Sequence, residues 1–442
     1  MKPLNVGLLG FGTVGKGTWD VLRRNEEEIT RRAGRPIRIT WIATRTLERA
    51  RTGTRGVTGV NLTADPTVVV RHPDVDIVCE LVGGVTPALG LVRDAIAHGK
   101  HVVTANKAML ALHGNEIFAA ASARGVMVAF EAAVAGGIPI IKALREGLTA
   151  NRIEWIAGIV NGTSNFILSE MRATGASFAT VLAEAQKRGY AEADPTFDVE
   201  GIDAAHKLTI MSAIAFGVPM QFDKAYAEGI TQLTREDIRY AEELGYRIKL
   251  LGITRRVLMN GREGIELRVH PTLIPHQRLI ANVEGAMNAV LVKGDATGPT
   301  LYYGAGAGAE ATASAVIADL VDVTRMHTAD PEHRVPHLAF QPDQLTNVPF
   351  LPIGEVVTSY YLRMRVEDRP GVLADITRIL ADREISIDAM IQKEPSEGEE
   401  QTDIILLTHR VVEKNVVDAI TKIEALPTVR GKIVRIRLEE LN

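Results

Sequence analysis

The sequence predicts an α/β protein in which a mostly parallel sheet, a mixed α+β region and a C-terminal βαββαβ unit follow one another. Short apolar runs alternate with helical spacing through roughly the first 130 residues, and a second regular alternation begins after about residue 355. The chain has 442 residues and a domain usually holds about 150, so we expect about three domains.

The N-terminal region is predicted to run strand, turn, helix, strand. Residues 6–9 form a short apolar run, residues 16–29 have helical spacing, and residues 37–43 are again typical of a strand. Repeated alternation of this kind indicates βαβ units and therefore a mostly parallel sheet. Further strands are expected at 75–81, 101–104 and 126–130, and further helices at 87–98 and 110–124.

A second domain of α+β type is expected at 137–303, where the pattern becomes mixed. Residues 331–354 hold five prolines in 24 residues, which disfavours regular structure and indicates a semi-extended linker. In the second domain, helices are expected at 165–172, 178–188 and 203–216, and strands at 153–160 and 265–269.

The C-terminal domain, at 355–442, shows the order strand, helix, strand, strand, helix, strand. This order predicts a small ferredoxin-like βαββαβ unit. Its elements are expected at 360–366, 371–383, 386–392, 403–408, 413–425 and 432–438.

The overall composition excludes several classes of protein. Hydrophobic side chains make up 46% and charged side chains 24% of the chain, close to globular averages, so a disordered or collagen-like chain is excluded. The 50 Lys and Arg residues face 54 Asp and Glu residues, and the resulting net charge of −4 disfavours binding to nucleic acid or to an anionic membrane. The longest apolar stretch, residues 126–144, contains Glu131, Pro139 and Lys142, so we expect no membrane span.

Cys79 is the one cysteine in the sequence, and it lies in an apolar run. It has no partner in the chain, so neither an intrachain disulfide nor a cysteine-based metal site can form. A reducing, cytoplasmic location fits best.

A glycine-rich turn lies directly between the first strand and the first helix. Gly10 permits the tight turn, Gly12 lets the backbone approach a pyrophosphate, and Gly15 allows close packing of helix on strand. Such a motif is often an ordinary glycine turn, but its place in a βαβ pattern predicts that it binds a dinucleotide. The six residues that match G-x-G-x-x-G are Gly10, Phe11, Gly12, Thr13, Val14 and Gly15.

The residues after the second strand bear on which dinucleotide binds. An acid there would bind the ribose 2′-hydroxyl of NAD, but the sequence has Thr44, Arg45, Arg49 and Arg51. Because arginine can pair with a 2′-phosphate, Arg45 favours NADP over NAD. The alternative is that Arg45 is an ordinary solvated surface arginine.

Five carboxylates and a lysine gather in the middle of the chain, and their pattern does not fit a calcium loop. An EF-hand needs glycine at its sixth position and glutamate at its twelfth, where counting from Glu192 gives Phe197 and Asp203. The cluster comprises Glu192, Asp194, Asp198, Glu200, Asp203 and Lys207.

Asp203 and Lys207 are four residues apart on a predicted helix, so they share one face. The alternative is a surface ion pair that contributes little to stability. However, the helix is apolar on nearly all sides and should be buried. A charged pair there is costly and is more often functional. Next to a nicotinamide, a partly desolvated lysine can donate a proton to the alkoxide formed when hydride reaches a carbonyl carbon. His206 is the other candidate for that role.

A long and specific pattern runs from Ala185 through Gly189-Tyr190-Ala191, Asp194-Pro195 and Asp198-Val199 to Asp203 and Lys207. This pattern resembles the signature of homoserine dehydrogenases, and the similarity extends in collinear order from residue 1 to about residue 330. The resemblance implies reversible, NAD(P)H-dependent reduction of L-aspartate 4-semialdehyde to L-homoserine, on the route to threonine, isoleucine and methionine. Four shorter matching segments are VTANK at 103–107, FEAAVAGGIP at 130–139, GIVNGTSN at 158–165 and YGAGAG at 303–308.

The resemblance also implies roles for individual residues. Lys207 would be the proton donor, Asp203 would orient it or the reacting oxygen, and Glu192 would bind the substrate ammonium. Asp198 would also bind substrate, and Lys107 would join the catalytic set by contacting substrate or cofactor near the reacting carbon.

The same resemblance implies a cofactor edge and a cation site. Gly304 would contact the cofactor, although Ala311-Thr312 departs from the Pro-Thr that the family often has nearby. Residues 304–330 would then return to the Rossmann-type NAD(P)-binding domain of residues 1–136. A monovalent cation, usually sodium in the family, would be held by backbone oxygens of Glu131, Val134, Gly136 and Ile138.

The C-terminal unit resembles an ACT domain, with Glu367-Asp-Arg-Pro-Gly371 at the start of its first helix. ACT domains bind amino acids in other enzymes, so the resemblance implies threonine as a regulatory effector, and we expect a homodimer or homotetramer. Two other functions stay open. One is a non-catalytic amino-acid or nucleotide sensor with the same fold, and the other is an NAD-dependent dehydrogenase for a related small amino-acid aldehyde or an oxyanion.

Overall fold

The computed structural model describes residues 2–259, 261–393 and 400–442. The chain divides into two compact units, which are described in turn. In the described residues, no helix has both the length and the apolar character that crossing a membrane requires. Unit 1 comprises Met1–Val160, His206–Asp223 and Met287–Val348, and unit 2 comprises Asn161–Ala205, Lys224–Ala286 and Pro349–Asn442.

Unit 1 is built around a six-stranded parallel sheet with the order β3-β2-β1-β4-β5-β6. At its centre, Val6 of β1 lies opposite Ile39 of β2 and Ile77 of β4. This is the order of doubly wound dinucleotide-binding sheets, so the predicted Rossmann-type sheet is confirmed. Its strands are β1 (Leu4–Leu9), β2 (Ile37–Ala43), β3 (Asn61–Thr63), β4 (Ile77–Glu80), β5 (His101–Thr104) and β6 (Val128–Ala129).

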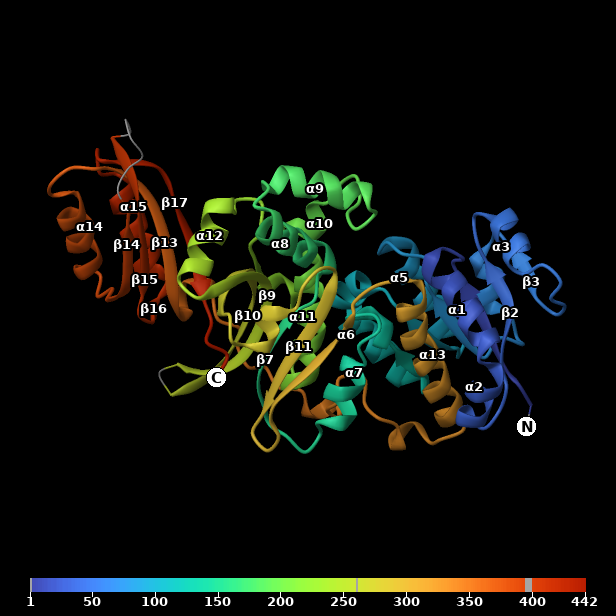
Figure 1. The fold of residues 1–442 in the computed structure, drawn as a ribbon. Helices are drawn as coiled ribbons and strands as arrows, with labels where there is room; N and C mark the ends of the chain where they lie inside the picture. Colours follow the sequence, from blue (N-terminus) through green and yellow to red (C-terminus); the bar gives the residue numbers. More distant parts are fainter. Residues whose placement is uncertain (1, 260, 394–399) are drawn as a thin grey trace. The chain divides into compact units, whose positions relative to one another are not determined.

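One helix of unit 1 differs from the prediction. The single helix predicted at 16–29 is wrong, because Asn25 has φ −110° and ψ 21° and separates α1 (Thr13–Arg24) from α2 (Glu26–Ala33). α1 packs closely on α13 (Ala309–Met326) (Figure 1). A Cβ at Gly17 would lie only 2.4 Å from the carbonyl oxygen of Ala309. The other helices are α3 (Leu47–Gly53), α4 (Pro66–Arg71), α5 (Thr86–Ala97), α6 (Lys107–Arg124) and α7 (Ile140–Lys142).

Three antiparallel strands also belong to unit 1. β11 (Met287–Gly294) pairs with β12 (Gly298–Ala305) on one side and with β7 (Ile153–Ile159) on the other. The strand predicted at 153–160 is confirmed, whereas β11 and β12 have no counterpart in the prediction.

Unit 2 contains a long hairpin. β9 (Tyr246–Met259) and β10 (Arg262–Pro275) are antiparallel and 14 residues long, so the strand predicted at 265–269 is only part of β10. β8 (Tyr226–Ala227) pairs in parallel with β10. The helices that precede or connect these strands are α8 (Gly162–Thr174), α9 (Phe178–Lys187), α10 (Thr196–Val199) and α12 (Arg235–Glu243).

The predicted C-terminal βαββαβ unit is confirmed. Its sheet has the order β17-β13-β15-β14, and two helices, α14 and α15, complete the fold (Figure 1). β17 also pairs in parallel with β10, which makes this sheet continuous with the hairpin of unit 2. The elements are β13 (Val357–Glu367), α14 (Val372–Ala381), β14 (Ile387–Gln392), β15 (Gln401–Thr408), β16 (Val411–Val412), α15 (Glu413–Glu424) and β17 (Val429–Leu438).

Buried ion pairs join β10 and β17 to their surroundings in unit 2. The guanidinium of Arg268 donates to Glu439 at 2.5 Å, and that of Arg437 donates to Glu413 at 2.5 Å and to Glu228 at 2.9 Å. Arg268 is 1% exposed and Arg437 is fully buried. Each of these charges therefore depends on its partners to offset its loss of hydration.

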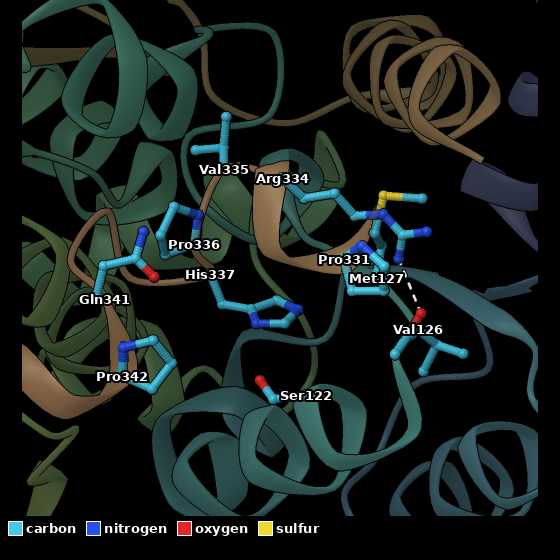
Figure 2. Close-up of a pocket in the computed structure, with 11 residues that line it drawn as sticks. Ser122, Val126, Met127, Pro331, Arg334, Val335, Pro336, His337, Gln341 and Pro342 are labelled. Atoms are coloured by element: carbon cyan, nitrogen blue, oxygen red, sulfur yellow. Dashed lines mark hydrogen bonds between the residues drawn. The ribbon is translucent and has the colours of Figure 1, made fainter. Parts of the chain in front are cut away.

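The proline-rich segment packs on unit 1 through His337. The Nε2 of His337 accepts a hydrogen bond of 3.1 Å from the backbone N of Val128, on the edge strand β6, and its ring stacks on Phe118. Burial, together with the charge of Arg145, lowers the pKa of His337 to about 4, so the imidazole is neutral and can accept that bond. Figure 2 shows His337 at the centre of the side chains that line a cavity of about 230 Å³, with Arg334 bonded to the backbone of the neighbouring loop.

Glu439→Gln should destabilise the fold and reduce its sensitivity to acid. Burial by itself would raise the pKa of Glu439, but Arg268 and Arg255 hold this pKa at about 2. The stabilisation is therefore present above the ordinary pKa of about 4.5 and is lost as the pH falls toward 2. In urea unfolding at pH 7, we expect the free energy of unfolding to fall by about 3–5 kcal/mol.

The matched control is Glu48→Gln, which removes the exposed pair of Glu48 with Arg51. This change should alter the free energy of unfolding by no more than about 1 kcal/mol. A Glu439→Gln protein as stable as the Glu48→Gln protein would show that the buried ion pairs do not stabilise the contact between β10 and β17.

Candidate active site

The glycine-rich turn joins β1 to α1, and the fold itself requires two of its three glycines. Gly10 has a φ of +94°, and a Cβ there would lie 2.5 Å from the carbonyl oxygen of Leu81. A Cβ at Gly15 would lie 2.2 Å from the carbonyl oxygen of Gly10. A Cβ at Gly12 would meet no atom of the described residues within 4 Å, so the fold does not require glycine there.

The side chains around this turn differ in exposure. Phe11 is buried, and its ring lies 2.8 Å from the place of a Cβ on Gly53, so its side chain is part of the core. Thr13, the first residue of α1, is exposed, whereas Val14 packs against the core of unit 1. Arg45 is exposed and follows the end of β2 by two residues.

Glu80 organises the carboxyl ends of β4 and β5. It is buried, and its two carboxylate oxygens accept hydrogen bonds from the backbone N of Val82 at 2.9 Å and from the hydroxyl of Thr104 at 2.6 Å. Thr104 in turn accepts from the backbone N of Asn106, and Asn106 caps α6. Lys107, the next residue, therefore begins α6 at a carboxyl edge that these bonds hold in place.

Residues 131–138, the predicted cation segment, contain an unusual backbone turn. Ala135 and Gly136 are consecutive left-handed residues, with φ of 55° and 43°, and a positive φ is uncommon for alanine. A Cβ at Gly136 would lie 2.6 Å from the carbonyl oxygen of Gly306, and a Cβ at Gly306 would lie 1.9 Å from the Nδ2 and 2.6 Å from the Oδ1 of Asn288. That Oδ1 is buried and has no hydrogen-bond partner in the described part of the chain.

The side chain of Glu131 has a structural role. Its carboxylate accepts hydrogen bonds from the backbone N of Ile141 and of Lys142, at 2.9 and 2.8 Å, and its own backbone N donates to Asp319. Burial raises the pKa of Glu131, and burial together with the charge of Glu131 raises the pKa of Asp319 to about 7. In the residues that the structure describes, no three His, Cys, Asp or Glu side chains gather as a metal site.

The carboxylates of the acidic cluster are only partly brought together in unit 2. Asp198, on α10, and Asp203, on α11 (Ile202–Phe216), both accept hydrogen bonds from the Nδ2 of Asn161, at 2.7 and 2.9 Å. Glu192 lies on an exposed loop, where its backbone oxygen accepts from Gln186 at 3.0 Å. The structure therefore joins two of the three predicted substrate carboxylates through one amide.

The first turn of α8 holds the acidic segment in place. The hydroxyl of Thr163 donates to the backbone oxygen of Tyr190 at 2.7 Å, and the hydroxyl of Ser164 donates to that of Asp198 at 2.9 Å. Asn161 is the N-cap of this helix, because its Oδ1 accepts from the backbone N of Ser164. The cap and the acidic segment thus depend on the same short stretch of chain.

α11 carries Asp203 and, one turn later, Lys207. The predicted burial of this helix is confirmed, since Asp203 is 4% exposed and its neighbours are mostly buried. Lys207, in unit 1, donates from Nζ to the backbone oxygen of Val160 at 2.7 Å. His206 is buried with its ring against Phe222, at 4.2 Å between ring centroids.

Two residues with clear roles in this geometry were not predicted from the sequence. Asn161 lies in the segment GIVNGTSN, but asparagine before a helix is usually no more than a cap. Glu80 ends an apolar run, and only its burial beside Thr104 shows what it binds.

Three family models match the chain, one after another. The model described as "Homoserine dehydrogenase, NAD binding domain" matches residues 10–131, and that described as "Homoserine dehydrogenase" matches residues 139–321. The ACT domain model matches residues 360–428.

The chain is also similar over its whole length to known proteins. It is 62% identical to a homoserine dehydrogenase of Pseudomonas aeruginosa over 443 residues, which cover 100% of both chains. It is 73% identical to a homoserine dehydrogenase of Thiobacillus denitrificans with a solved structure, with a TM-score of 0.95 and coverage of 100% and 99%. A solved homoserine dehydrogenase of S. aureus has 32% identity, a TM-score of 0.73 and coverage of 99% of each chain.

The turn geometry predicts different outcomes for alanine at two glycines. Gly15→Ala should lower the free energy of unfolding by about 1–3 kcal/mol, because the new Cβ would overlap the carbonyl oxygen of Gly10. Gly12→Ala should change it by less than about 0.5 kcal/mol, because no protein atom is near. Chemical denaturation of both variants measures the free energy of unfolding. Equal decreases in the two variants would contradict the described geometry of the turn.

Proposed function

We infer that this chain, which belongs to the homoserine dehydrogenase family, reduces L-aspartate 4-semialdehyde reversibly to L-homoserine. Its class is that of NAD(P)-dependent oxidoreductases acting on a CH–OH group. The observation that supports this function most directly is that the amide of Asn161 links Asp198 and Asp203. Lys207 follows one turn after Asp203 on the same helix. A place on the route to threonine, isoleucine and methionine is part of the same proposal.

The carboxylates suit an amino-acid substrate, which carries a cationic ammonium group. Asp198 is held by Asn161, and Glu192 is exposed on the neighbouring loop, so both are suited to bind that ammonium. Asp203 is buried and more closely held, which suits orienting the reacting oxygen or Lys207. In this proposal all three carboxylates bind substrate, and Asp203 also orients the reacting oxygen or Lys207.

Lys207 is the proposed proton donor. A reduced nicotinamide supplies hydride to the aldehyde carbon when it is bound. Lys207 then gives one proton to the aldehyde oxygen, so the C=O bond becomes CH–OH and the lysine becomes neutral until solvent returns the proton. The carbonyl oxygen of Val160 orients the Nζ, and Lys107 adds positive charge that stabilises the developing alkoxide.

The glycine-rich turn is the proposed dinucleotide site. Gly12 caps α1 without a side chain, so the first backbone N–H groups of this helix suit a pyrophosphate. Because the fold does not itself require glycine at 12, close approach of a ligand gives a reason for it. Arg45, exposed after β2, supports a preference for NADP over NAD through its 2′-phosphate.

A monovalent cation, with sodium as the first candidate, fits the segment at 131–138. The backbone oxygens of Glu131, Val134, Gly136 and Ile138 would hold it. The left-handed turn at Ala135 and the buried Oδ1 of Asn288 support a site with oxygen ligands, which hard cations prefer. Such a cation would fix the loop and supply positive charge without taking part in hydride transfer.

The packing within unit 1 supports the proposed domain roles. The contact of α1 with α13 supports the return of residues 304–330, with Gly304 at the cofactor edge, to the NAD(P)-binding domain of residues 1–136. Residues 137–303 would bind substrate and form a homodimer or homotetramer, and 331–354 would link them to the ACT domain at 355–442. Threonine is the proposed effector of that domain, and a cytoplasmic location fits the buried thiol of Cys79, whose pKa burial raises.

Lys207→Ala should lower kcat by about 10²- to 10⁴-fold with aspartate 4-semialdehyde and leave the KM for NADPH nearly unchanged. Lys207→Arg should not rescue the rate, because guanidinium keeps the charge but releases its proton poorly. Initial rates with NADPH and with NADH, side by side, measure both this role and the cofactor preference.

The matched control is Lys187→Ala, at the exposed C-terminal end of α9, which should keep wild-type rates. Wild-type turnover in Lys207→Ala, or full rescue by arginine, would contradict the proton-donor role. A wild-type protein inactive on the semialdehyde would contradict the proposed function itself.

A further inference from the structure

We propose that Asn161 is the positioning residue that holds Asp198 and Asp203 in the arrangement homoserine requires. The inference rests on the proposed function and adds to it a residue that does not need to touch the substrate. Three observations within unit 2 carry it: the bonds of the amide, the burial of the two aspartates, and the backbone on either side of them.

The amide of Asn161 is fully used, and only one orientation satisfies it. Its Nδ2 has two hydrogens and donates one to the Oδ1 of Asp198 and one to the Oδ2 of Asp203, at 2.7 and 2.9 Å. Its Oδ1 accepts from the backbone N of Ser164 at 2.8 Å. A flipped amide would turn oxygen toward two carboxylates, so the network itself assigns the two atoms.

The hydrogen bonds from Asn161 reduce the repulsion between the carboxylates of Asp198 and Asp203. Two carboxylates held by one small group repel each other, and water screens them only in part, because Asp203 is 4% exposed and Asp198 is half-buried. A neutral amide can donate to both without adding charge, and hydrogen bonds to charged acceptors are the stronger kind. An aspartate at this position would instead add a third negative charge.

The backbone supports the same arrangement from both sides. Gly201, with φ +79°, lies between Asp198 and Asp203 and lets the chain turn from α10 into α11. A Cβ at Gly162, next to Asn161, would lie 2.8 Å from the carbonyl oxygen of Ala286, so the backbone packs closely on this side of Asn161. The bridge therefore joins a closely packed loop to the turn between α10 and α11.

The arrangement has a direct consequence for substrate binding. Asn161 binds one oxygen of each carboxylate, which sets the direction of the whole group and hence of its other oxygen. Small errors in such directions are costly, since a misplacement of about 1 Å can lower a rate about 100-fold. Losing Asn161 should thus change both the KM for homoserine and kcat.

The test separates the bridge from the helix cap. Asn161→Ser and Asn161→Asp keep an oxygen that can cap α8, but neither offers the two N–H donors; Asn161→Ala loses both cap and bridge. We expect all three variants to raise the KM for homoserine about 10-fold and to lower kcat about 10- to 100-fold. The KM for NADP should stay within about 2-fold, because the cofactor turn is unaltered.

Ser177→Ala is the matched control, since it removes the N-cap of α9 and touches neither aspartate. It should lower the midpoint of thermal unfolding, as Asn161→Ala does, yet keep wild-type kcat and KM. Wild-type kcat and KM in Asn161→Ser or Asn161→Asp would overturn the inference, because the cap alone would then suffice. If the wild-type protein does not oxidise homoserine, the proposed function fails instead, so the two failures are distinguishable.

Discussion

In the proposed function, the bridge from Asn161 to two carboxylates is the interaction on which the substrate half of the site depends. Through it, the turn after β7 fixes α10 and α11, and Thr163 and Ser164 fasten the rest of the acidic segment to the same helix. Asp203 then leads, along one helix, to Lys207. A network in which each buried donor and acceptor has a partner is rigid, and rigidity is what a site for a small amino acid requires.

The same constraint, that buried charge must be paired, organises the junction of the C-terminal unit. Arg268 and Arg437 lie on adjacent parallel strands and are neutralised by Glu439, Glu413 and Glu228. From there, β8 and the loop after it lead back to the backbone oxygen of Val199, which accepts from Ile230. The C-terminal unit is thus joined to the acidic segment by paired strands.

The parallel sheet and the C-terminal unit could be predicted from the sequence because their strands are apolar and separated by clear turns. The long hairpin could not. β9 carries Arg255, which pairs with Glu439 far along the chain, and Arg256, which pairs with Glu263 of β10, and β10 contains Pro271. Pro271 is tolerated because β8 pairs with β10 before it and β17 after it. The role of Asn161 could not be predicted either, because its two aspartate partners lie about 40 residues away in sequence.

A double-mutant cycle on substrate binding tests whether Asn161 acts through the carboxylates that it bridges. Calorimetry would give the dissociation constant of homoserine in the presence of NADPH, which cannot accept hydride from it, for wild type, Asn161→Ser, Asp203→Ala and the double variant. If Asn161 acts through the carboxylates, Asn161→Ser weakens binding about 10-fold in the wild-type background and by clearly less once Asp203 is gone. An equal loss of affinity in both backgrounds would show that Asn161 acts independently of Asp203. That result would contradict the positioning role of Asn161.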